Sequence, residues 1–230
     1  MCWLLALTLL FVVAFLVWAS ADVGSGVYVE AFCRGSKARR EVALTFDDGP
    51  SGNTHEVLDV LREYGVEATF FLVGSEVERY PELAQRIVRE GHDVGNHTYS
   101  HSWTFPLRRE AAVRGELQRC CVSMERVLGF SPTLFRPPFG VTNPVIGRVV
   151  RSLHLRAVGW SIRSFDTLRG RSRGRTAKRV LTRLDGGAVI LLHDRCDGSG
   201  ALVRELIEGI AAQGYTFTTI GRMQRDENEC

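Results

Sequence analysis

Seven short apolar segments, most of them separated by stretches with helical periodicity, constrain the fold of this chain more than any other feature. Each segment has the length and the apolar content of a buried strand. They occupy residues 42–46, 67–73, 92–96, 133–136, 155–160, 188–193 and 215–220. Strands that alternate with helices form a parallel sheet through βα crossovers. The pattern therefore predicts an α/β domain, either a (β/α) barrel with fewer than eight units or an open doubly wound sheet.

The stretches between these segments predict helices. They lie at residues 54–64, 75–90, 108–128, 143–153, 176–184 and 200–213. Ser75 is a candidate N-cap for the second of them, and Gly91 is expected to end it. In a helix over residues 108–128, the apolar side chains fall on one stripe.

The first 21 residues are separate from this pattern. No charged residue occurs between Cys2 and Ala19, and the apolar run fits a signal-peptide core or a short membrane anchor. The sequence Ala19-Ser20-Ala21 fits a cleavage site and favours removal, whereas the length of the run and the lack of a preceding Lys or Arg leave an anchor open. Both alternatives predict an exported protein. We expect a linker at residues 22–40, one catalytic domain at 41–222 and a polar tail at 223–230.

Charge and cysteine content exclude some classes of function. A net charge of +3 over 230 residues is too small to indicate a nucleic-acid partner. A domain of this size needs no disulfide to fold. Beyond residue 2 there are five cysteines, which allow at most two disulfides of undetermined pairing: Cys33, Cys120, Cys121, Cys196 and Cys230. Free thiols are an equal alternative for the adjacent pair in the predicted helix.

Polar and ionisable side chains stand at or just beyond the ends of five predicted strands. They are Asp47 and Asp48, Asn96 and His97, Arg136, Trp160 with the following Asp166, and His193. The carboxyl ends of parallel strands meet at one face of a barrel or one edge of an open sheet, where active sites form. Five such strand ends together predict a functional site.

Two pairs within this set predict chemistry. Asp47 and Asp48 would point to opposite faces of a regular strand, but Gly49-Pro50 predicts a turn that can direct both inward. His97 and His101 are four residues apart and would share one face of a helical turn. One aspartate and two histidines form a ligand set for a divalent metal, and the second aspartate is left as a general base. Taken alone, each pair also fits a turn or backbone hydrogen bonds.

In order along the chain, these segments resemble the polysaccharide deacetylase family, also known as NodB-homology domains. The resemblance covers residues 41–221. It rests on Thr45-Phe-Asp-Asp-Gly-Pro50, His97-Thr-Tyr-Ser-His101, Arg136-Pro-Pro-Phe-Gly140, Trp160 with Asp166, and Leu191-Leu-His-Asp194. It implies a distorted (β/α) barrel of about seven strands. It also implies hydrolysis of N-acetyl groups on an N-acetylglucosamine-containing polysaccharide or oligosaccharide, with release of acetate.

The resemblance assigns roles by motif position. Asp48, His97 and His101 would bind a divalent metal, usually zinc and in some members cobalt or nickel. Asp47 would be the base that activates the metal-bound water, and Arg136 would tune its pKa.

The remaining motif residues would act on the other side of the substrate. His193 would be the acid that protonates the leaving amine, and Asp166 would orient it. The backbone N–H near Phe139 would contact the oxyanion, and Trp160 would contact the substrate. The fourth motif departs from the family pattern at Arg163 and Thr167, where acidic and aromatic residues are common, and this departure bears on substrate identity.

We expect a monomer whose partner is an N-acetylated glycan, with membrane attachment through residues 2–19 as an option. Two other functions remain open at this stage. One is a metal-dependent hydrolase of a small amide on the same barrel, and the other is a non-catalytic glycan-binding protein of the cell envelope. The arginine-rich stretch at residues 169–179 is expected to be a solvated loop and helix start.

Overall fold

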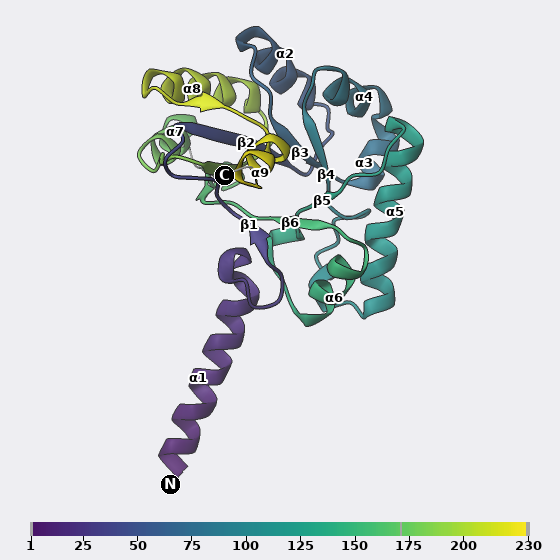
Figure 1. The fold of residues 1–230 in the computed structure, drawn as a ribbon, viewed down its shortest axis with the longest axis vertical. Helices are drawn as coiled ribbons and strands as arrows, with labels where there is room; N and C mark the ends of the chain where they lie inside the picture. The colour runs from purple at the N-terminus through teal and green to yellow at the C-terminus, as the bar shows by residue number, and fades with distance from the viewer. Residues whose placement is uncertain (1, 171, 229–230) are drawn as a thin grey trace.

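A curled sheet of parallel strands surrounded by helices forms the body of the molecule (Figure 1). The computed structural model describes residues 2–170 and 172–228. The strand order is β1-β6-β5-β4-β3-β2-β8-β7, and β9 pairs with β2. Among the described residues, no strand ladder joins β1 to β7 at the two ends of this order, so the barrel is incomplete. The predicted distorted (β/α) barrel is confirmed, and the open doubly wound alternative was wrong.

All seven predicted strands are present, and the structure adds two. The predicted ones are β2 (Glu41–Asp47), β3 (Thr69–Leu72), β4 (Asp93–Asn96), β5 (Leu134–Phe135), β6 (Arg156–Val158), β8 (Ala188–His193) and β9 (Thr216–Phe217). The additional strands are β1 (Ala31–Phe32) and β7 (Ile162–Arg163). β1 lies inside residues 22–40, where we expected a linker, and its two residues pair with Ala157 and Val158 of β6. Strands of two residues show no alternation that a sequence pattern could reveal.

Helices α2 to α8 surround the barrel, whereas α1 projects from it and α9 lies across one end. These helices are α1 (Cys2–Ala21), α2 (Thr54–Tyr64), α3 (Gly74–Arg79), α4 (Pro81–Arg89), α5 (Glu110–Leu128), α6 (Pro144–Ser152), α7 (Arg173–Leu181), α8 (Ser199–Ala212) and α9 (Ile220–Asn228). The single helix predicted over residues 75–90 is two helices, α3 and α4. Pro81 has no N–H to continue α3 and disfavours helical geometry at Tyr80, which adopts φ −127° and ψ 58°. Val73, and not Ser75, occupies the N-cap position of α3.

α9 closes the amino-terminal end of the barrel. It begins inside the predicted catalytic domain and continues through residues where we expected a polar tail. The side chains of Ile220 and Met223 are buried in a cluster with Phe71 and Val189 from the inner face of the sheet. The N–H of Ile220 also donates to Thr69 Oγ1 at 3.0 Å. Because this end is filled by apolar side chains, the opposite, carboxyl-terminal end of the strands is left to form a site.

Candidate metal and acid–base site

Asp48, His97 and His101 converge at the carboxyl end of the barrel. Asp48 directly follows β2, and the two histidines follow β4. The Nε2 atoms of His97 and His101 lie 3.4 and 3.3 Å from Asp48 Oδ1. Ligand atoms that share one ion at ordinary bond lengths lie roughly 3–3.5 Å apart. Among the residues that the structure describes, no other group of three His, Cys, Asp or Glu side chains is arranged in this way.

Left-handed backbone, and not a helical turn, brings these side chains together. Asp48, Thr98 and His101 have φ of 75°, 67° and 45°. The prediction that the two histidines share a helical turn was therefore wrong, although they do face one ligand. The reversal at Asp48 breaks the strand alternation, so that Asp47 and Asp48 both face the site. Asp, Asn and His adopt this conformation more readily than most residues.

Hydrogen bonding and burial prepare the histidines to bind a metal. His97 Nδ1 lies 2.8 Å from the carbonyl oxygen of Arg136, so this nitrogen carries the proton and Nε2 keeps a free lone pair. Burial, and then the neighbouring His97, lower the pKa of His101 to about 4. Burial opposes ionisation of Asp48, but the adjacent His97 and His101 side chains hold the pKa of its carboxyl below the usual range. One carboxylate oxygen and two imidazole nitrogens suit zinc and similar first-row ions.

Asp47 is held by a fully buried arginine. Arg136 is 0% exposed, and its Nη1 donates to Asp47 Oδ1 at 2.7 Å and to Thr45 Oγ1 at 2.8 Å. Its Nη2 donates to the carbonyl oxygen of Gly159 at 2.7 Å. Asp47 Oδ2 is left to face the site, 3.8 Å from His97 Nε2. Arg136 therefore fixes the orientation of Asp47 and compensates its charge in a buried position.

His193 is held by Asp166 in a comparable way. Asp166 Oδ1 accepts a hydrogen bond from His193 Nδ1 at 2.8 Å, and Oδ2 accepts one from the His193 backbone N–H at 2.7 Å. The hydroxyl of Ser164 donates to Oδ1 at 2.9 Å. Burial alone would lower the pKa of His193, but the hydrogen bond and charge of Asp166 outweigh it and raise the pKa above its ordinary value.

These two pairs meet across one cleft. Asp47 and His193 are register partners on the adjacent strands β2 and β8. Both line a cavity of about 210 Å³ together with Asp48, His97, His101, Phe139, Gly140, Trp160, Arg163, Thr167, Leu191 and Arg195. Phe139 is 48% exposed and lies edge-on to the His101 ring at 4.9 Å. Seven of the nine predicted site residues thus line the cleft, and Arg136 and Asp166 contact the cleft residues Asp47 and His193.

The structure adds Arg195, which the sequence reasoning missed, and shows contacts of Asp194 and Gly49, which were named in motifs but given no role at the site. Arg195 Nε lies 3.0 Å from Asp48 Oδ2, and Arg195 stands two positions after His193, which was the one available signal. Asp194 is fully buried, accepts a hydrogen bond from Thr54 Oγ1 at 2.6 Å, and burial raises its pKa to about 7. A Cβ at Gly49 would overlap the Asp194 carboxylate, so glycine is required for this turn to pack against β8.

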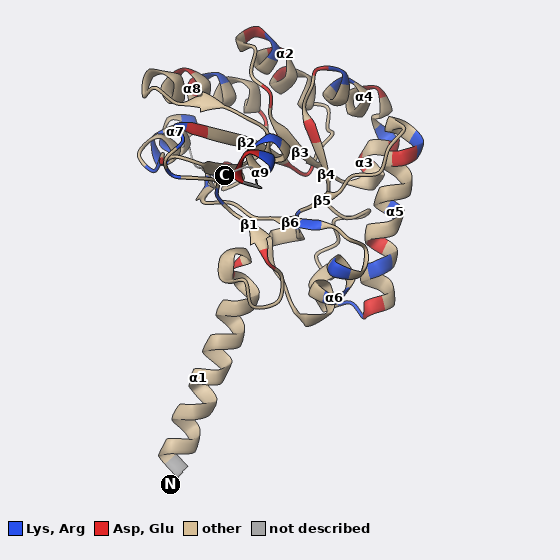
Figure 2. Cartoon of the chain, in the orientation of Figure 1, with Lys and Arg blue, Asp and Glu red and all other residues tan. Residues whose placement is uncertain are grey.

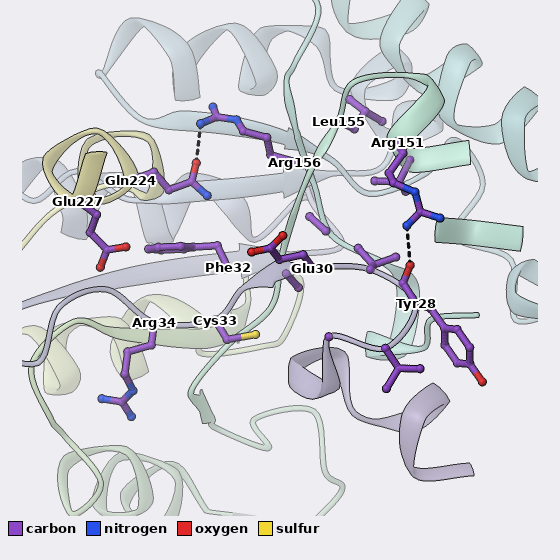
Figure 3. Close-up of a pocket in the computed structure, with 16 residues that line it drawn as sticks. Tyr28, Glu30, Phe32, Cys33, Arg34, Arg151, Leu155, Arg156, Gln224 and Glu227 are labelled. Atoms are coloured by element: carbon purple, nitrogen blue, oxygen red, sulfur yellow. Dashed lines mark hydrogen bonds between the residues drawn. The ribbon is translucent and has the colours of Figure 1, made fainter. Parts of the chain in front are cut away.

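A larger cavity lies apart from the cleft and shares none of its lining residues. It has a volume of about 720 Å³ and lies between β1, the α6–β6 connection and α9 (Figure 3). Its polar lining mixes glutamate and arginine side chains.

The four described cysteines beyond Cys2 are free thiols, and Cys230 lies outside the described residues.

Comparisons with known proteins agree with the fold and the arrangement of the site. The family model for polysaccharide deacetylase matches residues 34–158. A peptidoglycan-N-acetylglucosamine deacetylase of Bacillus cereus is 33% identical over 207 residues, which cover 88% of this chain and 74% of that protein. The peptidoglycan-N-acetylglucosamine deacetylase PgdA of Listeria monocytogenes is 35% identical over 82% of this chain. This chain spans only 40% of that relative's length.

Solved structures show the same fold in two functional classes. The Bc1960 peptidoglycan N-acetylglucosamine deacetylase superposes with a TM-score of 0.79 at 32% identity, over 90% of this chain and 95% of that one. A mutant of BA3943, described as a CE4 family pseudoenzyme with restored enzymatic activity, superposes with a TM-score of 0.77 at 26% identity, over 83% of this chain and 70% of that one. Fold alone therefore does not distinguish an enzyme from a pseudoenzyme in this group. By sequence match and fold, this chain belongs to the polysaccharide deacetylase family.

Proposed function

We propose that this protein is an exported, metal-dependent hydrolase that removes N-acetyl groups from an N-acetylglucosamine-containing glycan and releases acetate. The observation that carries the proposal is the pairing of Asp47 and His193 on adjacent strand ends, beside the Asp48–His97–His101 cluster. The relatives named as peptidoglycan deacetylases support the substrate class.

Asp48, His97 and His101 would hold the metal, which we expect to be zinc. A bound zinc ion polarises a carbonyl and lowers the pKa of its water ligand. Asp47 would accept the proton of the attacking water through Oδ2, because Arg136 occupies Oδ1. Because Arg136 also donates to Thr45 Oγ1 and to the carbonyl oxygen of Gly159, its guanidinium is held in place and would keep Asp47 in one orientation during the reaction.

His193 would donate a proton to the departing amine from Nε2, because Asp166 holds Nδ1. The raised pKa of His193 favours the protonated form that this role requires. Trp160 and Phe139 would form the walls against which the sugar lies, and the backbone near Phe139 would contact the oxyanion. Base and acid on two sides of the acetyl group predict a bell-shaped pH profile.

The test is acetate release by the purified full chain in detergent. The substrates are N-acetylglucosamine oligomers and solubilised peptidoglycan, with zinc or cobalt supplied. Wild type is compared with Asp47→Asn, with a chelator, and with Asp59→Asn as a matched exposed aspartate on α2. We expect metal-dependent release that Asp47→Asn reduces by at least about 10²-fold and that Asp59→Asn leaves unchanged. Bound metal without acetate from any glycan would refute the proposal and favour a glycan-binding pseudoenzyme or a small-amide hydrolase.

A further inference from the structure

The last turn of α1 is part of the folded domain. Ala19 is fully buried, and its carbonyl oxygen accepts a hydrogen bond from Ser25 Oγ at 3.0 Å. The carbonyl oxygen of Ser20 accepts a hydrogen bond from the N–H of Thr142 at 2.9 Å. Thr142 is 2% exposed. Loss of residues 1–21 would remove the acceptor of this N–H.

The rest of α1 has the properties of a membrane span. Residues Trp3–Ala21 form 19 helical positions with a mean hydropathy of 2.5, and only 6% of their most apolar window is buried. Figure 1 shows α1 leaving the domain beside β1, β6 and α6, with no other element along most of its length. A signal peptide meets the same criteria of length and composition, so the contacts of the last turn are the evidence that favours a retained anchor.

The segment after α1 is fixed to the domain and does not form a flexible tether. The carbonyl oxygen of Tyr28 accepts a hydrogen bond from Arg151 Nη1 at 2.9 Å (Figure 3). The same backbone packs so closely on α6 that a Cβ at Gly147 would overlap it. Val29 is buried in the cluster that also contains Phe105. The orientation of the domain relative to α1 is therefore set by these contacts.

Several exposed apolar side chains belong to segments that are linked to this end of α1. Outside α1, seven large apolar side chains of the described residues are prominently exposed: Val27, Trp103, Leu107, Val122, Phe130, Phe139 and Leu168. Val27 lies six residues after the end of α1, and Phe139 lies three residues before Thr142. Trp103 and Leu107 are 77% and 80% exposed.

The loop that carries Trp103 and Leu107 is tied to the same region. Between them, the carbonyl oxygen of Pro106 accepts a hydrogen bond from Asn143 Nδ2 at 2.7 Å, and Asn143 adjoins Thr142. Four of the seven exposed apolar side chains thus belong to segments joined to the end of α1. Such clustering on a soluble surface marks an interaction site.

The charge of this region is positive. Residues 22–28, 102–109 and 144–152 together contain four arginines and one aspartate, with no lysine or glutamate. Figure 2 shows basic positions on α6, acidic and basic positions together on the first part of α5, and no charged position on α1. Arg108 pairs with Glu116 and Arg148 with Glu110 on α5, and the remaining positive charge would attract an anionic membrane surface.

We propose that residues 22–28, the loop at 102–109 and α6 form a bilayer face, which lies on the membrane that α1 spans. Tryptophan, leucine and arginine together are typical of the membrane–water interface, where the indole lies at headgroup depth. The bilayer face adjoins the cleft, because Phe139 and Gly140 line the cleft and Thr142 contacts α1. The cleft therefore opens beside the bilayer. Resting on the proposed deacetylase function, this placement assigns as substrate a glycan held at the membrane surface, such as one attached to a lipid.

The first test measures where Trp103 lies. The full chain, carrying Trp3→Phe, Trp18→Phe and Trp160→Phe, keeps Trp103 as its one indole. It is placed in vesicles of phosphatidylcholine and phosphatidylglycerol whose acyl chains are brominated near the headgroup. Bromine quenches indole fluorescence on contact, and we expect strong quenching of Trp103. In the matched variant, Trp103→Phe is combined with Phe130→Trp, which places the one indole beyond the other end of α5, far from α1, and we expect little quenching. Equal quenching at the two positions, or no quenching of Trp103, would overturn the proposal.

The second test measures retention of α1 and the effect of the bilayer face on turnover. Mass spectrometry of the membrane fraction should find residues 1–21 still attached, and a product that starts at Asp22 would contradict the proposal. Acetate release is then compared between N-acetylglucosamine linked to a lipid in the same vesicle and a soluble oligomer. Trp103→Asp with Leu107→Asp should lower the first rate at least several-fold and leave the second unchanged. Equal loss on both substrates would argue against the bilayer face, whereas no acetate from either substrate in wild type would count against the deacetylase function alone.

Discussion

The Arg136–Asp47 pair offers a quantitative test of how the site is built. Arg136 is the largest fully buried side chain described, and it donates hydrogen bonds to Asp47, Thr45 and two backbone carbonyls. Arg136→Met keeps much of the side-chain volume and removes the charge and the donors. Asp47 then remains buried, at 4% exposed, without its cation.

The expected cost follows from this burial. Removing one partner of a buried, hydrogen-bonded ion pair costs about 3–5 kcal/mol of unfolding free energy, because the remaining charge is uncompensated. For a chain of this size that loss corresponds to roughly 6–20 °C in Tm. The matched control is Arg204→Met. Arg204 pairs with Glu63 on the surface, with side chains 40% and 54% exposed, and such a pair contributes at most about 1 kcal/mol.

Thermal and urea unfolding of the full chain in a mild detergent measure both variants. The double variant Arg136→Met with Asp47→Asn completes a cycle, because Asn carries no charge that needs compensation. We expect it to be more stable than the sum of the two single losses predicts, with a coupling of about 2–3 kcal/mol. A coupling below about 0.5 kcal/mol, or an Arg136→Met loss no larger than that of Arg204→Met, would refute the reasoning that the pair acts as one buried unit.

Three further predictions concern the rest of the site. Asp166→Asn removes the carboxylate that raises the pKa of His193, so this pKa should fall. Protonated His193 is then lost at lower pH, and the alkaline limb of the kcat/KM profile should move to lower pH; an unmoved limb would exclude this role of Asp166. His101→Gln removes one nitrogen of the three-ligand cluster and should lower the amount of metal bound per chain about 10-fold or more, measured by mass spectrometry after dialysis. The control His154→Gln, at an exposed histidine, should leave the bound metal unchanged. Gly140→Ala places a side chain on a residue with φ 72° and against the indole of Trp160, which lines the cleft. The substitution should lower the free energy of unfolding, measured by thermal denaturation, by about 1–3 kcal/mol, and it should raise KM. An unchanged KM would show that Trp160 does not contact substrate.

Periodicity was sufficient to predict the elements that are long or strongly amphipathic. The helix predicted at residues 54–64 coincides with α2, because its apolar face and the Gly65 C-cap are both local signals. β1 and β7 were missed because two residues define no period, and they are strands only through pairing with β6 and β8. The division between α3 and α4 was a local signal at Pro81 that the apolar pattern obscured.

The identity of the site residues was determined by the sequence. Strands in parallel order must bring their carboxyl ends together, so Asp47, Asp48, His97, Arg136 and His193 were predicted to lie close to one another from their positions alone. How they bind could not be predicted. The two histidines meet Asp48 through left-handed backbone at Thr98 and His101, which depends on the surrounding loops and on no periodic pattern.

Tertiary structure alone decided which atom faces which. Arg136 Nη1 donates to Asp47 Oδ1 because the curled sheet brings β5 and β2 to one buried interior, where Arg136 Nη2 also donates to the carbonyl oxygen of Gly159. The packing of the last turn of α1 against the domain also depends on a contact between residues 20 and 142, which no local signal links. Sequence patterns report the burial and periodicity of neighbouring residues, whereas the direction of a side chain and the meeting of distant segments depend on how the whole chain packs.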